Sequence, residues 1–74
     1  DTPNPSSYYV FPNGVQVRDI SAHLTGFGAQ IVQYAARSTR LDGNNKGQKD
    51  DWIRDMEKII DLAKWEAQRL KDQP

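Results

Sequence analysis

The segment DDWIRDMEKIIDLAKWEAQRL, residues 50–70, contains the longest helical pattern of the chain. Its apolar side chains recur every three or four residues, the spacing that places them on one face of an α-helix. The main apolar stripe consists of Trp52, Met56, Ile59, Ile60, Ala63, Ala67 and Leu70. Aspartates in the first turn and basic residues near the other end both suit the helix dipole. We therefore predict a helix over residues 50–70.

A second helix is predicted over residues 27–40. Its apolar or small side chains fall within a narrow arc at 100° per residue. They are Phe27, Ile31, Tyr34, Ser38 and Leu41. Residues 42–47, DGNNKG, are rich in turn-forming residues and predict a loop. A short connection between two helices favours an antiparallel pair.

The N-terminal part predicts smaller elements. Residues 8–11 and 15–17 are β-prone and flank a Pro-Asn-Gly turn, so we expect a short β-hairpin. Asp19 is a candidate cap for a short helix that ends near Leu24. Residues 1–7 contain two prolines and are expected to form a flexible arm. The expected fold is mainly α: a hairpin, a short helix and two longer antiparallel helices, in one domain over residues 8–74.

Composition limits the possible functions. A chain of 74 residues buries a small core, and without cysteine it has no disulfides. Zinc is almost excluded because His23 is the only histidine. We therefore expect stabilisation by a homo-oligomer. Ten basic and ten acidic residues give a net charge of zero, which argues against duplex nucleic acid as a partner. No segment is apolar enough for a membrane span, and a cytoplasmic location is expected.

The helix over residues 50–70 carries a second stripe away from Ile53 and Ile60. It consists of Asp55, Lys58, Leu62 and Trp65, spaced i, i+3, i+7 and i+10. Leucine and tryptophan together are unusual on a solvated face, so we expect Leu62 and Trp65 to form a subunit contact. A ligand-pocket wall, or simply scattered exposed apolar residues, remain alternatives.

The border of the second helix presents polar groups suited to a nucleotide. Gln30, Tyr34 and Arg37 are spaced i, i+4 and i+7, and Arg40 follows three residues later. A guanidinium can bind a phosphate through two parallel hydrogen bonds, and a tyrosine ring can stack on a base. From spacing alone, a core-edge tyrosine with two solvated arginines is the favoured interpretation.

Several other motifs carry no such prediction. Gly26-Phe27-Gly28 precedes a helix but lacks the lysine and further glycine of a phosphate-binding loop. His23 has no cysteine or second histidine as companion, so we expect it to be a surface or packing residue. Asp50, Asp51 and Asp55 offer carboxylates to magnesium, although helix capping explains the first two more simply. No resident metal is expected; magnesium would accompany a bound nucleotide.

Residues 27–40, FGAQIVQYAARSTR, resemble the phage-borne SaV-like family of small proteins described as nucleotide kinases. Family members read an aromatic, any residue, then Gly-Asn-Ala-Val-Lys-Tyr-Ile-any-Arg-Ala-Gly-Arg. Tyr8, the Pro12–Val15 turn and Asp19-Ile20 resemble the family's upstream pattern. Asp55-Met56-Glu57-Lys58 resembles its Asp-Leu-any-Lys. The resemblance covers residues 8–70 and implies a small helical oligomer that phosphorylates nucleoside monophosphates without a P-loop.

The chain departs from that pattern at several positions. The family's Gly and Asn are Ala29 and Gln30, its Lys is Gln33, and the His before its Tyr is Ser7. The matching residues are Tyr8, Tyr34, Arg37, Arg40, Asp55 and Lys58. If the family uses its His and Asn chemically, this chain binds nucleotides without turnover.

We therefore expect a nucleotide site formed by Tyr8, Gln30, Tyr34, Arg37, Arg40, Asp55 and Lys58. The arginines and the lysine would hold phosphates, a tyrosine would stack on the base, and Asp55 would orient Lys58 or a magnesium-bound water. The leading hypothesis is a phage-type nucleotide-binding protein acting in the host cytoplasm, with a nucleoside monophosphate kinase that lacks a P-loop as its enzymatic form. The alternative is a non-enzymatic anti-defence protein that sequesters a nucleotide signal or inhibits a host protein. A third possibility is a purely structural oligomerisation module.

Overall fold

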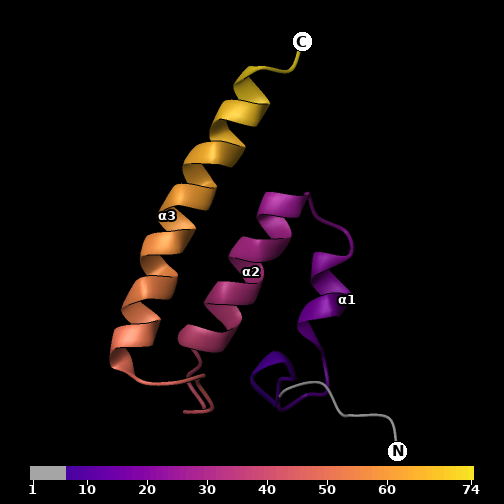
Figure 1. Ribbon diagram of the computed structural model, residues 1–74. Helices are drawn as coiled ribbons and strands as arrows, with labels where there is room; N and C mark the ends of the chain where they lie inside the picture. Colours follow the sequence, from indigo (N-terminus) through magenta and orange to yellow (C-terminus); the bar gives the residue numbers. More distant parts are fainter. Residues whose placement is uncertain (1–6) are drawn as a thin grey trace, which may run out of the picture.

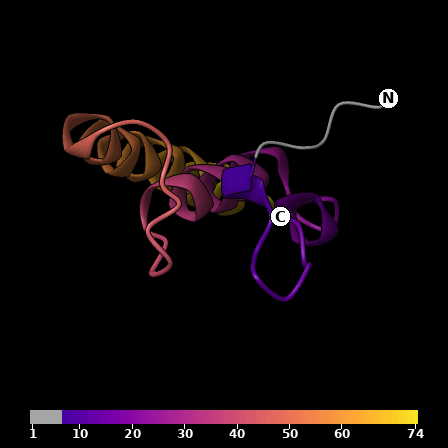
Figure 2. The ribbon, with the colours of Figure 1, turned by 90° about the horizontal axis from the view of Figure 1, so that it is seen from below.

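The computed structural model describes residues 7–74 and is dominated by three α-helices (Figure 1). A 3-10 helix, η1 (Ser7–Tyr9), is followed by α1 (Val17–Ser21), α2 (Gly26–Ser38) and α3 (Lys49–Lys71). Figures 1 and 2 both show α2 between α1 and α3, so the three helices form one layer. The arm predicted for residues 1–7 lies outside the described residues except for Ser7, which begins η1. No described helix combines the length and apolar character needed to cross a membrane.

The two long helices form the predicted antiparallel pair. Thr25, at the start of α2, donates a side-chain hydrogen bond to Glu66 near the end of α3. Ser38, at the end of α2, donates to Asp55 in the first half of α3. The last turns of α3 project past the N-terminal end of α2 (Figure 1).

Local sequence explains where these helices begin. The Thr25 hydroxyl accepts a hydrogen bond from the Gly28 amide and caps α2. Asp51 and Asp19 each accept a hydrogen bond from the backbone amide three residues earlier, at the starts of α3 and α1. In α1 the cap residue is Gln16 and not the predicted Asp19, so the helix begins at Val17.

The predicted N-terminal β-hairpin is wrong. The chain does turn at residues 12–14, where Gly14 has φ 85°, and Phe11 donates to the Val15 carbonyl. Within residues 7–74, however, the only β pairing is an isolated bridge between Val10 and Gln16. Residues of both predicted strands belong to helices instead. Tyr8 and Tyr9 lie in η1, and Val17 is the buried first residue of α1. A two-residue bridge without a third strand has too few hydrogen bonds to extend.

The face of α3 that packs on α2 shares only Trp52 and Ile59 with the predicted main stripe. We call the packed face the inner seam. Its residues are Trp52, Asp55, Ile59, Leu62, Glu66 and Arg69, all buried or half-buried. Leu62 is 2% exposed, whereas Ile60 and Leu70 of the predicted stripe are each 54% exposed. Leu62 is therefore a core residue and has no surface left for the predicted subunit contact.

Leu41, predicted on the apolar arc of the second helix, is fully exposed because α2 ends at Ser38. Trp65 is 55% exposed and lies against Phe27 of α2, with ring centroids 6.0 Å apart. A subunit contact through Trp65 stays a prediction.

Leu62→Ala is expected to lower the free energy of unfolding by about 3 kcal/mol, because it leaves a cavity in a small core. Urea unfolding followed by the helical circular-dichroism signal measures this change. The matched control is Leu41→Ala, which removes the same atoms from a side chain in solvent and should change stability by less than about 0.5 kcal/mol. Equal effects of both substitutions would show that Leu62 does not anchor the core.

Candidate functional site

An ion pair between Arg37 of α2 and Asp55 of α3 lies at the centre of the candidate site. Arg37 Nε donates to Asp55 Oδ2 at 2.8 Å, and Nη2 donates to Oδ1 at 2.9 Å. The side chains are only 18% and 10% exposed. A bidentate geometry of this kind is the strongest form of the arginine–carboxylate contact.

Neighbouring polar groups satisfy the rest of this pair. The buried Ser38 hydroxyl donates to Asp55 Oδ2. The Tyr9 hydroxyl accepts a hydrogen bond from Arg37 Nη1 at 3.4 Å and another from Gln33 Nε2 at 3.2 Å. Three segments of the chain, η1, α2 and α3, therefore meet at one polar network.

The network shifts the pKa values of its members. The hydrogen bonds from Arg37 lower the pKa of Asp55, against the opposing effect of burial, and Ser38 adds to the decrease. The bond to Asp55 likewise raises the pKa of Arg37. Burial alone would raise the pKa of Tyr9, but the hydrogen bonds from Gln33 and Arg37 outweigh it and lower that pKa. Asp55 and Arg37 are thus both charged at neutral pH.

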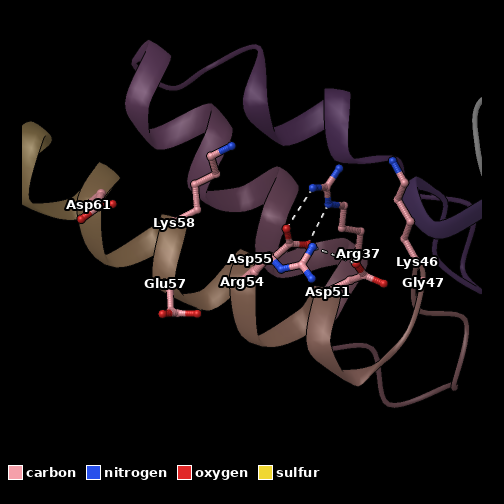
Figure 3. A pocket seen from close by; sticks show the side chains of 9 residues that line it. All are labelled: Arg37, Lys46, Gly47, Asp51, Arg54, Asp55, Glu57, Lys58 and Asp61. Carbon is pink, nitrogen blue, oxygen red and sulfur yellow. Dashed lines mark hydrogen bonds and ion pairs between the residues drawn. The ribbon is translucent and has the colours of Figure 1, made fainter.

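A hollow of about 630 Å³ opens beside this pair (Figure 3). Its lining consists of Arg37, Lys46, Gly47, Asp51, Arg54, Asp55, Glu57, Lys58 and Asp61. Four of these residues are basic and four are acidic, so the hollow is neutral overall. In Figure 3, the amino groups of Lys46 and Lys58 point toward the side on which the Arg37 guanidinium lies, and the Glu57 carboxylate points the opposite way. The hollow therefore has a basic side and an acidic edge.

Two lysines mark the basic side. Lys58 Nζ lies 5.4 Å from the centroid of the Tyr34 ring, which also has the Arg37 guanidinium at 4.6 Å. Lys46 Nζ lies 5.8 Å from the centroid of the Tyr8 ring. Among residues 7–74, neither lysine forms an ion pair with a carboxylate. Both amino groups are thus available to an anion.

The backbone fixes the position of Lys46. Its amide donates to the Arg37 carbonyl at 2.8 Å, and its carbonyl accepts from the Trp52 indole at 2.9 Å. Gly47 follows with φ 77°, and a Cβ at this position would collide with the Asp51 carboxylate. Only glycine suits this tight entry into α3.

The structure brings together most of the predicted site. Arg37, Asp55 and Lys58 line the hollow, and Tyr34 contacts two of them. Tyr8 lies beside Lys46, with its ring edge-on to Tyr9 at 5.3 Å. The predicted stacking of Tyr34 on a base does not fit this arrangement, because two cations already occupy the space around its ring.

Two predicted residues lie elsewhere. Gln30 is exposed on α2 and does not line the hollow. The Arg40 side chain is 2% exposed and is held by Asp42 at 2.6 Å and by the Phe11 ring at 4.6 Å. It also donates to the Ser7 carbonyl at 3.1 Å. Arg40 therefore fastens the N-terminal segment to the loop and does not line the hollow.

Three residues of the site have no signal in the sequence: Lys46 and Arg54, which line the hollow, and Tyr9, which contacts Arg37. Lys46 lies in a loop, where periodicity gives no information. Tyr9 is adjacent to the predicted Tyr8, and no local pattern distinguishes the two. Of the residues that the structure describes, no three carboxylate or histidine side chains gather closely enough to hold a metal ion.

Comparisons with protein-family models, curated proteins and solved structures give no match for this chain. The site must therefore be interpreted from its own geometry.

The ion pair predicts a specific pH dependence of stability. Because the pKa of Asp55 is lower in the folded chain than its unfolded value of about 3.9, its contribution is present above about pH 4 and is lost as the pH falls through the folded pKa. Asp55→Asn should lower the free energy of unfolding at pH 7 by about 3 kcal/mol, since Arg37 then loses its partner. The loss should shrink toward acid pH.

Urea unfolding at a series of pH values measures both effects. Asp61→Asn is the control, because Asp61 is exposed and forms no ion pair within residues 7–74. A constant difference between wild type and Asp55→Asn at every pH would contradict the assignment.

Proposed function

We propose that the hollow between α2 and α3 binds a nucleotide, or another phosphate-bearing small molecule, without turning it over. The observation that carries this proposal is the pair of lysines, Lys46 and Lys58, on either side of a neutralised Arg37–Asp55 pair. Two amino groups without carboxylate partners present their charges on one side of a hollow of about 630 Å³. Small-molecule sites typically have volumes of this order, from about 300 to 1,000 Å³.

The charge distribution favours a ligand with two different ends. Phosphate oxygens suit the basic side, where Lys46 and Lys58 donate and Arg37 has further N–H groups beyond those bound to Asp55 and Tyr9. Hydroxyl groups of a sugar suit the acidic edge, where Glu57 and Asp61 accept hydrogen bonds. The Tyr8 ring lies beside Lys46 but outside the lining of the hollow. A nucleotide supplies both features, phosphate oxygens and sugar hydroxyl groups.

The pKa of the Asp55 carboxylate favours binding over catalysis. A carboxylate is most effective as a general base at neutral pH when its pKa is raised toward 7. The hydrogen bonds from Arg37 instead lower the pKa of Asp55, the carboxylate at the centre of the site. Sequestration of a nucleotide therefore suits the geometry better than phosphoryl transfer, and a kinase that works by positioning alone is the second candidate.

Isothermal titration with nucleoside mono- and triphosphates, with and without magnesium, tests the binding. We expect Lys46→Ala and Lys58→Ala each to weaken binding about tenfold, because each removes one charge-assisted contact to phosphate. Arg18→Ala, on α1, removes the same charge away from the hollow and serves as the control. No heat with any nucleotide, or equal losses in all three variants, would refute the proposal.

Turnover is measured separately by chromatography of nucleotide mixtures incubated with the protein and magnesium. The proposal predicts that the bound nucleotide is recovered unchanged. Formation of a nucleoside diphosphate from a monophosphate and ATP, lost in Lys58→Ala, would instead establish the kinase.

A further inference from the structure

A second apolar seam runs along α3, one residue C-terminal to the inner seam, and we call it the outer seam. Its residues are Ile53, Met56, Ile60, Ala63, Ala67 and Leu70. Their spacing alternates between three and four residues, as in the a and d positions of a coiled coil. Ile53 is 48% exposed, and Ile60 and Leu70 are each 54% exposed. The inner seam packs on α2, whereas every residue of the outer seam except the half-buried Met56 is exposed.

We propose that the outer seam binds the outer seam of a second copy of this chain, with the two α3 helices antiparallel. This association does not require the proposed nucleotide binding, because Arg37, Lys46 and Lys58 are not in the seam. Glu57 is shared, since it lines the hollow and flanks the seam. At 100° per residue the hollow and the outer seam lie on opposite flanks of α3.

Side-chain volumes favour the antiparallel orientation. When the midpoints of the two helices, between Asp61 and Leu62, lie opposite each other, Ile60 meets the partner's Ala63. Met56 meets the partner's Ala67 in the same way. Each of these contacts pairs a large side chain with an alanine, which lets the two helices approach closely. A parallel pair would place alanine on alanine and isoleucine on isoleucine.

Charges along the free flank select the same orientation. The positions flanking the seam on the side away from α2 are Asp50, Glu57, Lys64 and Lys71, seven residues apart. Their order is two acidic residues followed by two basic ones. In the antiparallel pair, Glu57 lies near the partner's Lys64, and Asp50 lies near the partner's Lys71. By symmetry all four contacts join opposite charges, the arrangement that fixes partner and orientation in coiled coils.

The projecting end of α3 fits this arrangement. Leu70 belongs to the last turn of α3, and the last turns of this helix extend past the N-terminal end of α2 (Figure 1). In the antiparallel pair it packs against the partner's Ile53 and gains a neighbour that its own chain does not supply. Six side chains on one helix face form an interface at the small end for specific complexes, below about 1,200 Å² in total. We therefore expect a dissociation constant of the order of micromolar.

Disulfide trapping tests the orientation, and the chain has no cysteine of its own. In the antiparallel pair, residue 53 lies about 26 Å along the axis from its own copy but opposite residue 70. The Ile53→Cys and Leu70→Cys variants should therefore cross-link when mixed under mild oxidation, and neither should cross-link alone. Cross-linking of each variant with itself would indicate a parallel pair and overturn the proposal.

A charge exchange supplies a second test with less disturbance of the seam. Sedimentation equilibrium up to about 100 μM measures the association of wild type, Glu57→Lys, Lys64→Glu and the double variant. Each single variant should raise the dissociation constant about tenfold, because two symmetric contacts become repulsive, and the double variant should restore it. Circular dichroism checks that helix content is unchanged. A monomeric wild type, or a double variant as weak as the single ones, would overturn the proposal.

Discussion

The ion pair between Arg37 and Asp55 is the constraint on which the packing of this chain depends. A carboxylate on the packed face of a helix is tolerated only when its charge and lone pairs are satisfied. Arg37, Ser38 and Tyr9 together supply those contacts. The pair therefore sets the rotation of α3 about its axis. Leu62, seven residues after Asp55, is directed into the core by the same rotation.

That rotation also determines what α3 leaves exposed. The flank on one side of the inner seam presents Lys58 to the hollow, next to the already neutralised pair. The opposite flank presents Ile53 and Ile60 to solvent. One polar contact thus separates a charged surface suited to a small anion from an apolar surface suited to another helix.

Much of the fold follows from local sequence. The three helices and the loop of residues 42–47 carry clear periodicity and turn residues, and Thr25 and Asp51 fix the helix starts. The orientation of α3 does not follow, because its two seams have the same spacing and the outer one is the more apolar. Hydropathy cannot predict that Asp55 is buried, since its partner lies 18 residues away. Arg40 matches a family motif but is held by contacts within the chain, and Lys46 lies in a loop but lines the hollow. Both outcomes depend on contacts between distant segments, which a local pattern does not predict.

Glu57 connects the two proposed binding surfaces, since it lines the hollow and flanks the outer seam. In the antiparallel pair, the partner's Lys64 neutralises this carboxylate and shifts the balance of the hollow toward positive charge. An anionic ligand would then bind the pair more tightly than the single chain. Binding free energies are reciprocal, so the ligand would promote association to the same degree. A domain in which Val17 and Leu62 are the buried hydrophobic side chains among residues 7–74 would gain stability from both proposed contacts.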